Sequence, residues 1–258
     1  MRFVRFLYKK DQEFAAAWGL LHEDEIEFIE GNPFAEWKTT GETIKIYKVR
    51  YLAPTRPQKI ICSGLNYANH AKEMDMKIPP DPVIFLKPPS SIQHPEGDIV
   101  MPPDCKELDF EAELAIIIKH RAKNISPEEA KDYILGYTCL NDVTARKYQT
   151  PGSQWTRSKG YDTFCPIGPI ISCGINPNRL DIKTFLNEEE KQSSNTSEMI
   201  INAEKLVSIV SGYMTLNPGD IISTGTPSGV GKMVIGDVVE VVIEKIGTLR
   251  NYVTDEEI

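Results

Sequence analysis

Two glutamates stand inside a segment that otherwise has the sequence of a buried strand, Asp109 to Ile118 (DFEAELAIII). Side chains of a strand alternate between faces, so Glu111 and Glu113 should point the same way, about 6.6 Å apart at roughly 3.3 Å per residue. Two carboxylates this close repel each other and resist leaving water, whereas the isoleucine run indicates burial. A hard divalent cation between them would resolve both problems. The alternative is a Glu-x-Glu pair on the solvated face of an antiparallel strand.

Asp142 offers a third hard ligand, because it follows the apolar stretch Ile134 to Leu140 at the point where a strand would end. Asp in a turn also commonly caps the next few residues, and the residues alone leave that interpretation open. Three carboxylates with no Cys or His nearby in the sequence favour Mg²⁺, Mn²⁺ or Ca²⁺ over Zn²⁺. Such a site would keep open positions for water or substrate oxygens.

His70 and Glu73 lie three residues apart in a predicted short helix, Asn66 to Met74. The carboxylate can then orient the imidazole and raise its basicity. Exposed pairs of this kind are common and usually have no function. This pair, however, directly follows an apolar run that ends in Gly64, so a strand formed by that run would place it at the edge of the fold. His70 is therefore the best placed general base of the four histidines.

Lys159 lies in a run that mixes aromatic, cationic and hydroxyl residues, Gln154 to Phe164. Its ammonium could neutralise negative charge that develops on an enolate or a carboxylate. The alternative is an ordinary solvated lysine in a surface loop. The glycine-rich segment Ser223 to Gly231 lacks the Gly-Lys-Ser/Thr ending of a phosphate loop, so we interpret it as an anion-binding turn at most.

Short β-like runs in the first 57 residues predict a small β-rich unit ahead of the residues described above. These runs are Arg2 to Tyr8, Ala16 to Leu21, Glu25 to Ile29 and Thr43 to Val49. The proline-containing segment Ala53-Pro54-Thr55-Arg56-Pro57 then favours a domain boundary near residue 57. We therefore expect one domain over residues 1–57 and a second over residues 58–258.

The larger part also contains more strand patterns than helix patterns. Strands are predicted at Val83 to Leu86, Asp220 to Ser223 and Asp237 to Ile243, and helices at Ala203 to Thr215 and from a capping box at Ser126 to a closing Gly136. The polar segment Asn187 to Glu198 is expected to be a mobile surface loop. Because strands and helices do not alternate regularly, the fold class is predicted to be β-rich α+β rather than a doubly wound sheet or a barrel of eight units.

Composition limits the partners and the compartment. The 258 residues include 29 Lys and Arg against 37 Asp and Glu, and the formal net charge of -8 comes without a basic tract, which argues against nucleic acid and anionic membranes. The five cysteines lack CxxC spacing and mostly sit in apolar segments, as reduced core residues do. Without a signal peptide or an apolar run of about 18 residues, we expect a soluble cytoplasmic protein.

Seven segments between residues 58 and 252 resemble, in the same order, the fumarylacetoacetate hydrolase family. They are Gly64-Leu65-Asn66-Tyr67 with His70 and Glu73, Phe85-Leu86-Lys87-Pro88, Asp109 to Leu114, Asn141 to Arg146, Gln154 to Phe164, Pro166-Ile167-Gly168-Pro169 and Gly219 to Pro227. Each segment is a weak signal, but seven in order make coincidence improbable.

The resemblance implies roles for individual residues. Glu111, Glu113 and Asp142 match the family's carboxylate ligands for Mg²⁺ or Mn²⁺, with Ca²⁺ as a further candidate. His70 with Glu73 matches the dyad that activates water or handles the proton, and Lys159 matches the lysine near the metal. Four more positions match residues that contact substrate or lie near the metal and lysine in some members, namely Arg146, Gln149, Thr163 and Thr226.

The resemblance also implies a β-rich roll of mixed sheets behind a variable N-terminal region, usually in a homodimer. Two departures stand out: Lys147 replaces an Asp of many relatives, and Gly160-Tyr161 replaces a small residue followed by Phe. The first puts a local salt bridge in doubt, and the second could reshape the pocket beside the lysine.

The activity implied by the resemblance is hydrolysis of a C–C bond in a 2,4-dioxo acid, such as an acylpyruvate or fumarylpyruvate, through an enolate that the metal stabilises. Decarboxylation of an oxaloacetate-like substrate and isomerisation or decarboxylation of a 5-carboxymethyl-2-hydroxymuconate-like substrate are alternatives on the same residues. A non-enzymatic alternative is an inactive homologue that binds small molecules, although a structural metal would not require His70, Glu73 and Lys159.

Overall fold

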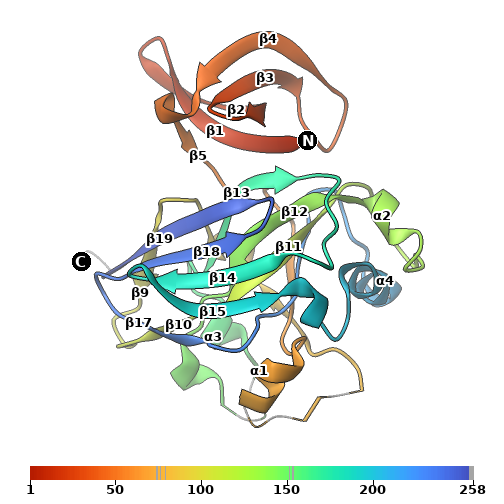
Figure 1. The fold of residues 1–258 in the computed structure, drawn as a ribbon, viewed down its shortest axis with the longest axis vertical. Coiled ribbons are helices and arrows are strands. Elements are labelled where there is room, and N and C mark those ends of the chain that lie inside the picture. Colours follow the sequence, from red (N-terminus) through yellow and green to blue (C-terminus); the bar gives the residue numbers. More distant parts are fainter. Residues whose placement is uncertain (74, 76, 79, 151, 153, 256–258) are drawn as a thin grey trace.

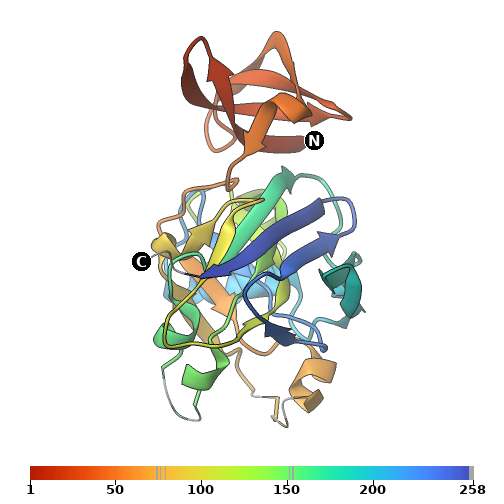
Figure 2. The same ribbon diagram turned by 90° about the vertical axis from the view of Figure 1, so that its left-hand side faces the viewer.

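The computed structural model describes residues 1–73, 75, 77–78, 80–150, 152 and 154–255. Figure 1 and Figure 2 show a small β unit, formed by the start of the chain, standing above a larger β-rich body. The segment from Ala53 to Pro57 lies between the last strand of the small unit and the first strand of the larger body. A domain boundary at residue 57 remains a prediction.

The small unit is an antiparallel meander of β1 (Arg2–Lys10), β2 (Glu13–His22), β3 (Glu25–Gly31) and β4 (Trp37–Lys45), with β5 (Val49–Tyr51) paired to β1. Apolar side chains of the strands pack together in its interior, and the rings of Phe6 and Tyr8 both contact Phe28 edge to face. β1 also pairs with β13 of the larger body, through Arg2 with Ser172 and Phe3 with Ile171. The two parts thus share one sheet.

The central sheet of the larger body runs in the order β13 (Cys165–Ser172), β12 (Ile134–Asn141), β11 (Ala112–Ile118), β16 (Ile221–Ser223), β6 (Ile60–Ser63) and β7 (Ile84–Lys87). Every residue of β11, β12 and β13 is buried, because both faces of these strands are covered. The pairing is antiparallel except between β16 and β6, so the sheet is mixed.

A second sheet packs against the first, in the order β15 (Glu189–Asn195), β14 (Asp181–Leu186), β18 (Val238–Ile243), β19 (Gly247–Asp255) and β9 (Asp98–Met101). The shared core includes Leu114 and Ile116 of the first sheet and Ile182, Val241 and Ile243 of the second. Two short strands, β10 (Leu108–Phe110) and β17 (Gly231–Met233), form a separate pair, and β8 (Ile92–Gln93) joins β13.

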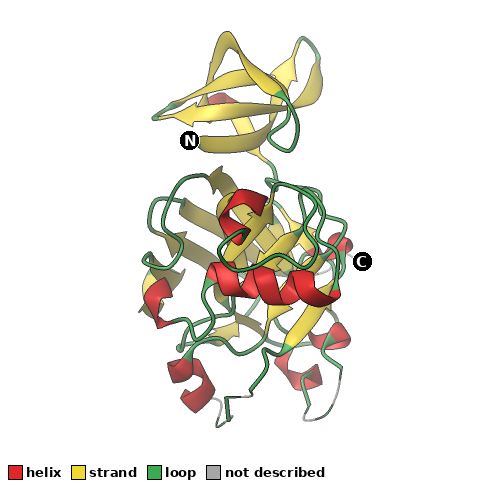
Figure 3. Ribbon diagram, turned by 90° about the vertical axis from the view of Figure 1, so that its right-hand side faces the viewer, coloured by secondary structure: helices red, strands yellow, loops and turns green. Residues whose placement is uncertain are grey.

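Helices are few and short, apart from α4 (Ala203–Tyr213), which lies across the larger body in Figure 3. The Asn202 side chain caps it by accepting the Lys205 N–H, and Leu206, Val207 and Val210 are buried on the core side. The others are α1 (Ala68–Glu73), α2 (Ala130–Tyr133) and α3 (Thr156–Lys159). In the described part of the chain, no helix has the length and apolar content needed to cross a membrane.

The predicted β-rich α+β class is confirmed, but four local predictions are wrong. Thr43 to Val49 is not one strand, because β4 ends at Lys45, a 3-10 turn follows over Ile46–Lys48 and β5 begins at Val49. Asn187 to Glu198 is not a mobile loop: it contains the edge strand β15, which keeps its polar side chains exposed and buries Gln192. The capping box at Ser126 forms, yet Gly136 does not end its helix, because β12 already begins at Ile134. The acidic segment is not one strand, since it breaks at Glu111 between β10 and β11. Met74, at the end of the predicted α1, lies outside the described residues.

Candidate metal centre

The three predicted carboxylate ligands meet at one buried point. Glu111 lies at the break between β10 and β11, Glu113 lies on β11, and Asp142 follows the end of β12. One carboxylate oxygen from each lies within 4.8 Å of the others. Their exposed fractions are only 4%, 1% and 1%. The break brings Glu111 into the group, because its backbone C=O accepts the Asp142 N–H and its own N–H donates to the Asn141 side chain, both at 2.9 Å.

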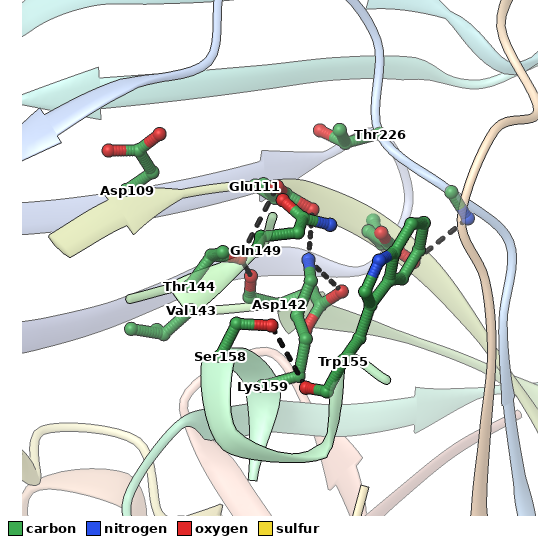
Figure 4. A network of polar contacts seen from close by, with 12 residues as sticks. Asp109, Glu111, Asp142, Val143, Thr144, Gln149, Trp155, Ser158, Lys159 and Thr226 are labelled. Carbon is green, nitrogen blue, oxygen red and sulfur yellow. Dashed lines mark hydrogen bonds and ion pairs between the residues drawn. The ribbon is translucent and has the colours of Figure 1, made fainter. Parts of the chain in front are cut away.

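Three cationic side chains pair with the group, and Figure 4 shows one of them, Lys159, between Glu111 and Asp142. The Lys159 Nζ lies 2.8 Å from Glu111 Oε2 and 2.7 Å from Asp142 Oδ2, and it is itself 2% exposed. The Lys87 Nζ lies 2.6 Å from Asp142 Oδ1. Arg146 donates to Glu111 Oε1 at 2.5 Å. Two of the three carboxylates are therefore neutralised by protein cations.

Glu113 is the carboxylate that lacks such a partner. Within the described residues it has no ion pair, and it is held by the Ser223 hydroxyl and, at 2.8 Å, by the Gly225 N–H. Burial raises the pKa of Glu113, and the neighbouring carboxylates of Asp142 and Glu111 raise it further, to about 8. Burial also disfavours the charge of Glu111, but Lys159 and Arg146 outweigh it and lower the pKa of that carboxyl.

A divalent cation fits this donor set. Three carboxylates provide the hard oxygen ligands that Mg²⁺ and Mn²⁺ prefer. A cation would also provide the positive charge that Glu113 lacks. The buried Asp109 Oδ1 and Asn141 Nδ2 beside the group have no hydrogen-bond partner in the described structure, which is consistent with a site that takes up water or ligand.

The predicted dyad forms at the edge of the same site. His70 is 4% exposed, and its Nδ1 lies 3.0 Å from Glu73 Oε2. The other oxygen of Glu73 accepts the Gly229 N–H at 2.9 Å, so the carboxylate is fixed at both ends. With Nδ1–H donated to Glu73, Nε2 of the neutral ring is the acceptor. When protonated, His70 lowers the pKa of Glu111, in agreement with a position near the carboxylates.

The four predicted substrate positions do not all lie together. Arg146 donates to Asp109, Glu111 and Gln149, and therefore orients Glu111 as well as Gln149. Gln149 shares Arg146 with Glu111, and Thr226 is linked through Gln192 to Ala112, the residue after Glu111. Thr163 lies elsewhere: its hydroxyl accepts the Val100 N–H at 2.9 Å and lines a cavity of about 1000 Å³ that is not lined by the three carboxylates.

The family model of the fumarylacetoacetate hydrolase C-terminal domain matches residues 59–254. The chain belongs to the fumarylacetoacetate hydrolase family. A second model, of the Rv2993c-like N-terminal region, matches residues 1–54. The resemblance seen in the sequence is confirmed.

Relatives of this chain have several activities. It is 43% identical to the mitochondrial oxaloacetate tautomerase Fahd2a of Rattus norvegicus over 218 residues, which cover 80% of this chain and 70% of the relative. The structure of 5-carboxymethyl-2-hydroxymuconate delta-isomerase from Mycobacterium smegmatis matches with a TM-score of 0.92 and 39% identity, covering 99% of this chain and all of that one. Maleylpyruvate hydrolase from Sphingobium sp. SYK-6, in complex with manganese and pyruvate, matches with a TM-score of 0.82 and 31% identity over both whole chains.

The family fold therefore positions residues that the sequence analysis did not single out. Lys87 is 1% exposed on β7 and contacts Asp142. The sequence feature that could have identified it is a lysine at the end of a short apolar strand. The glycine-rich segment does bind an anion, namely the Glu113 carboxylate, through Ser223 and Gly225. No sequence pattern indicated that Gln192 is buried, because its polar segment was expected to be a surface loop.

Gln192 connects the metal strand to the glycine-rich segment. Its Oε1 accepts the Ala112 N–H at 3.0 Å and the Thr184 hydroxyl at 2.6 Å. Its Nε2 donates to Thr226 Oγ1 at 2.9 Å and to the Pro227 carbonyl at 2.8 Å. The backbone partners fix the orientation of the amide. Since Thr226 Oγ1 accepts this bond, the hydroxyl hydrogen of Thr226 is available to a ligand.

Replacing Gln192 by leucine is expected to lower the free energy of unfolding by about 3 kcal/mol or more, because several buried polar groups each lose a partner at about 1–3 kcal/mol. Urea denaturation of the metal-free protein measures the change. Gln12→Leu, at an exposed turn, is the matched control and should leave the midpoint unchanged. Equal stability of the Gln192→Leu protein and the native protein would show that the amide does not support this region.

The raised pKa of Glu113 makes metal affinity depend on pH. Below pH 8 the metal must displace the proton, so the Mn²⁺ association constant is expected to rise by up to about tenfold per pH unit from pH 6 and to level off above about pH 8. Isothermal titration in two buffers of different ionisation enthalpy also counts the proton released. An affinity that stays constant from pH 6 to pH 8, with no proton release, would show that Glu113 is already ionised.

Proposed function

We propose that this protein is a divalent-metal-dependent hydrolase that cleaves a C–C bond in 2,4-dioxo acids of the acylpyruvate or fumarylpyruvate type. The observation that carries the proposal is the buried His70, whose Nδ1 is held by Glu73 beside three clustered carboxylates. A histidine oriented in this way is suited to take a proton from water. The manganese and pyruvate in the related maleylpyruvate hydrolase support the same ligand classes.

Glu111, Glu113 and Asp142 would hold Mg²⁺ or Mn²⁺. When bound, such an ion would act as a Lewis acid toward the keto and carboxylate oxygens of the substrate.

The remaining roles belong to side chains of this chain. His70 Nε2 accepts the proton of the attacking water, and Glu73 stabilises the imidazolium that results. The buried Lys159 ammonium, whose pKa the carboxylates of Asp142 and Glu111 raise against the effect of burial, stays charged and offsets negative charge on the departing enolate. Thr226 donates its hydroxyl hydrogen to a substrate oxygen.

Tautomerisation of oxaloacetate is the second candidate. The 43% identity to the rat oxaloacetate tautomerase favours it, and the reaction needs the same base but no attacking water. The two reactions differ in their products, since hydrolysis gives two acids and tautomerisation leaves the carbon chain intact.

A turnover panel with Mg²⁺ or Mn²⁺ tests the assignment. Its substrates are acylpyruvates, fumarylpyruvate, oxaloacetate and 5-carboxymethyl-2-hydroxymuconate, and the products are identified by chromatography. Release of pyruvate from an acylpyruvate or fumarylpyruvate at the highest kcat/KM is the expected result. Faster enol–keto exchange of oxaloacetate, with no cleavage of any 2,4-dioxo acid, would replace hydrolysis by tautomerisation. The homodimer and the cytoplasmic location that the sequence suggested also remain proposals.

A further inference from the structure

A group of basic side chains without acidic partners lies where the small N-terminal unit meets the larger body. Arg5, on β1, is 8% exposed, and the one hydrogen bond of its side chain in the described structure goes to the Ala53 carbonyl at 3.3 Å. No carboxylate pairs with it among the described residues. A buried guanidinium without a counter-ion is costly, because the protein does not replace the water that it loses.

Arg56 adds a second guanidinium to this group. It lies in the segment between the two parts, is exposed, and likewise has no ion pair in the described part of the chain. Burial lowers the pKa of Arg5, and the charge of Arg56 lowers it further, as expected of two cations near each other. Two neighbouring guanidinium groups repel unless an anion lies between them.

His94 supplies a further donor. Its Nδ1 accepts the Ala53 N–H at 2.9 Å, which fixes the tautomer, so Nε2 of the neutral ring carries the hydrogen. Burial and the charges of Arg5 and Arg56 lower the pKa of this imidazole, which keeps it neutral. It therefore presents an N–H donor to a ligand without requiring protonation.

Two cavities meet at these side chains. One of about 330 Å³ and one of about 240 Å³ share Arg5, Thr55 and Arg56 in their walls. Trp18 and Phe34 line the first, and His94 lines the second. Neither wall contains an Asp or Glu, although the whole chain carries a formal net charge of -8. The junction is thus an electropositive recess in an acidic protein.

We propose that this recess binds a small oxyanion, with a phosphoryl or carboxylate group held between the guanidinium groups of Arg5 and Arg56 and the Nε2–H of His94. Planar guanidinium groups suit such anions because they donate two parallel hydrogen bonds. The aromatic walls formed by Trp18 and Phe34 leave room for an organic group attached to the anion. Since Arg5 belongs to the small unit and His94 to the larger body, a bound anion stabilises their junction.

Isothermal titration of the full-length Mg²⁺-loaded protein tests the site with inorganic phosphate and with succinate, each at constant ionic strength in sodium chloride. A saturable site for at least one of them, and a rise in Tm at the same concentrations, are expected. The stronger ligand identifies the group as phosphoryl or carboxylate. No heat and no rise in Tm with either anion, beyond the effect of chloride, would overturn the proposal.

Variants locate the site. Arg56→Gln should fold normally because Arg56 is exposed, and it should weaken binding at least about tenfold by removing one charged donor group. Arg50→Gln removes the same charge from an exposed arginine that lines neither cavity and should not change binding. Equal losses in the two variants would show a non-specific charge effect and would overturn the proposal.

The candidate metal centre is the other place where the anion could bind, and Lys159→Met distinguishes the two. Binding that survives Lys159→Met and is lost in Arg56→Gln supports the recess. Binding that survives Arg56→Gln and is lost in Lys159→Met contradicts it. Because binding is measured by heat rather than by turnover, the result does not depend on the proposed hydrolase activity.

Discussion

Glu113→Ala protein is expected to lose divalent-metal binding and turnover together, with the metal affinity falling by more than about 100-fold. Among the described residues, Glu113 is the one of the three carboxylates that forms no ion pair with a protein cation, so we expect its charge to depend most on the metal. The same variant should keep its fold. In the metal-free folded protein the pKa of Glu113 is raised from 4.5 to about 8, so the native protein loses stability as pH rises through this range. Replacing Glu113 by alanine removes this loss of stability.

Glu107→Ala is the matched control, because Glu107 precedes the same acidic segment but is exposed and pairs with Lys232. Isothermal titration with Mn²⁺ and steady-state rates measure both effects, and thermal unfolding of metal-free protein reports the fold. Full turnover in metal-depleted Glu113→Ala protein would show that the reaction does not require the metal. Loss of the folded state would instead assign Glu113 a structural role.

His70→Ala is expected to lower kcat by about 10²- to 10⁴-fold while metal affinity stays within about twofold, because the histidine transfers a proton and is not a ligand. Glu73→Gln should have a smaller effect, since it keeps a hydrogen-bond acceptor for Nδ1–H but removes the charge that stabilises the imidazolium. Steady-state kinetics with an acylpyruvate, beside Mn²⁺ titration, separate the two effects.

His22→Ala serves as the control for the histidine change, because His22 lies on β2 with a largely exposed side chain. Its kinetics should equal those of the native protein. An undiminished kcat in His70→Ala protein would refute the role of the dyad. Loss of metal binding in that variant would mean that His70 supports the carboxylates rather than the proton.

Local patterns in the sequence predicted many of the strands and, with the family resemblance, the cluster of three carboxylates. The apolar stretch before Asp142 did form β12, and the Val- and Ile-rich segment from Asp237 did form β18. Both strands are predicted by short runs of apolar residues, because such runs favour a buried strand. The approach of Glu111, Glu113 and Asp142 followed from the same patterns together with the family resemblance.

What local patterns did not predict depends on partners far apart in the sequence. Gln192 is buried because its amide satisfies Ala112 and Thr226, 80 and 34 residues away. Lys87 is buried because it meets Asp142, 55 residues away. Tertiary hydrogen bonds of this kind override the polarity of a segment. The Thr163 hydroxyl likewise has a distant partner, the Val100 N–H, 63 residues away, and it lines a cavity whose walls do not include the three carboxylates.

Stoichiometric activation by manganese tests the central claim most directly. EDTA-treated protein is titrated with Mn²⁺ while free Mn²⁺ is followed by electron paramagnetic resonance and cleavage of an acylpyruvate is followed in the same samples. The expected result is activity that rises in proportion to bound Mn²⁺ and saturates at a single ion per chain, held by Glu111, Glu113 and Asp142. Full cleavage activity before any Mn²⁺ is bound would contradict it.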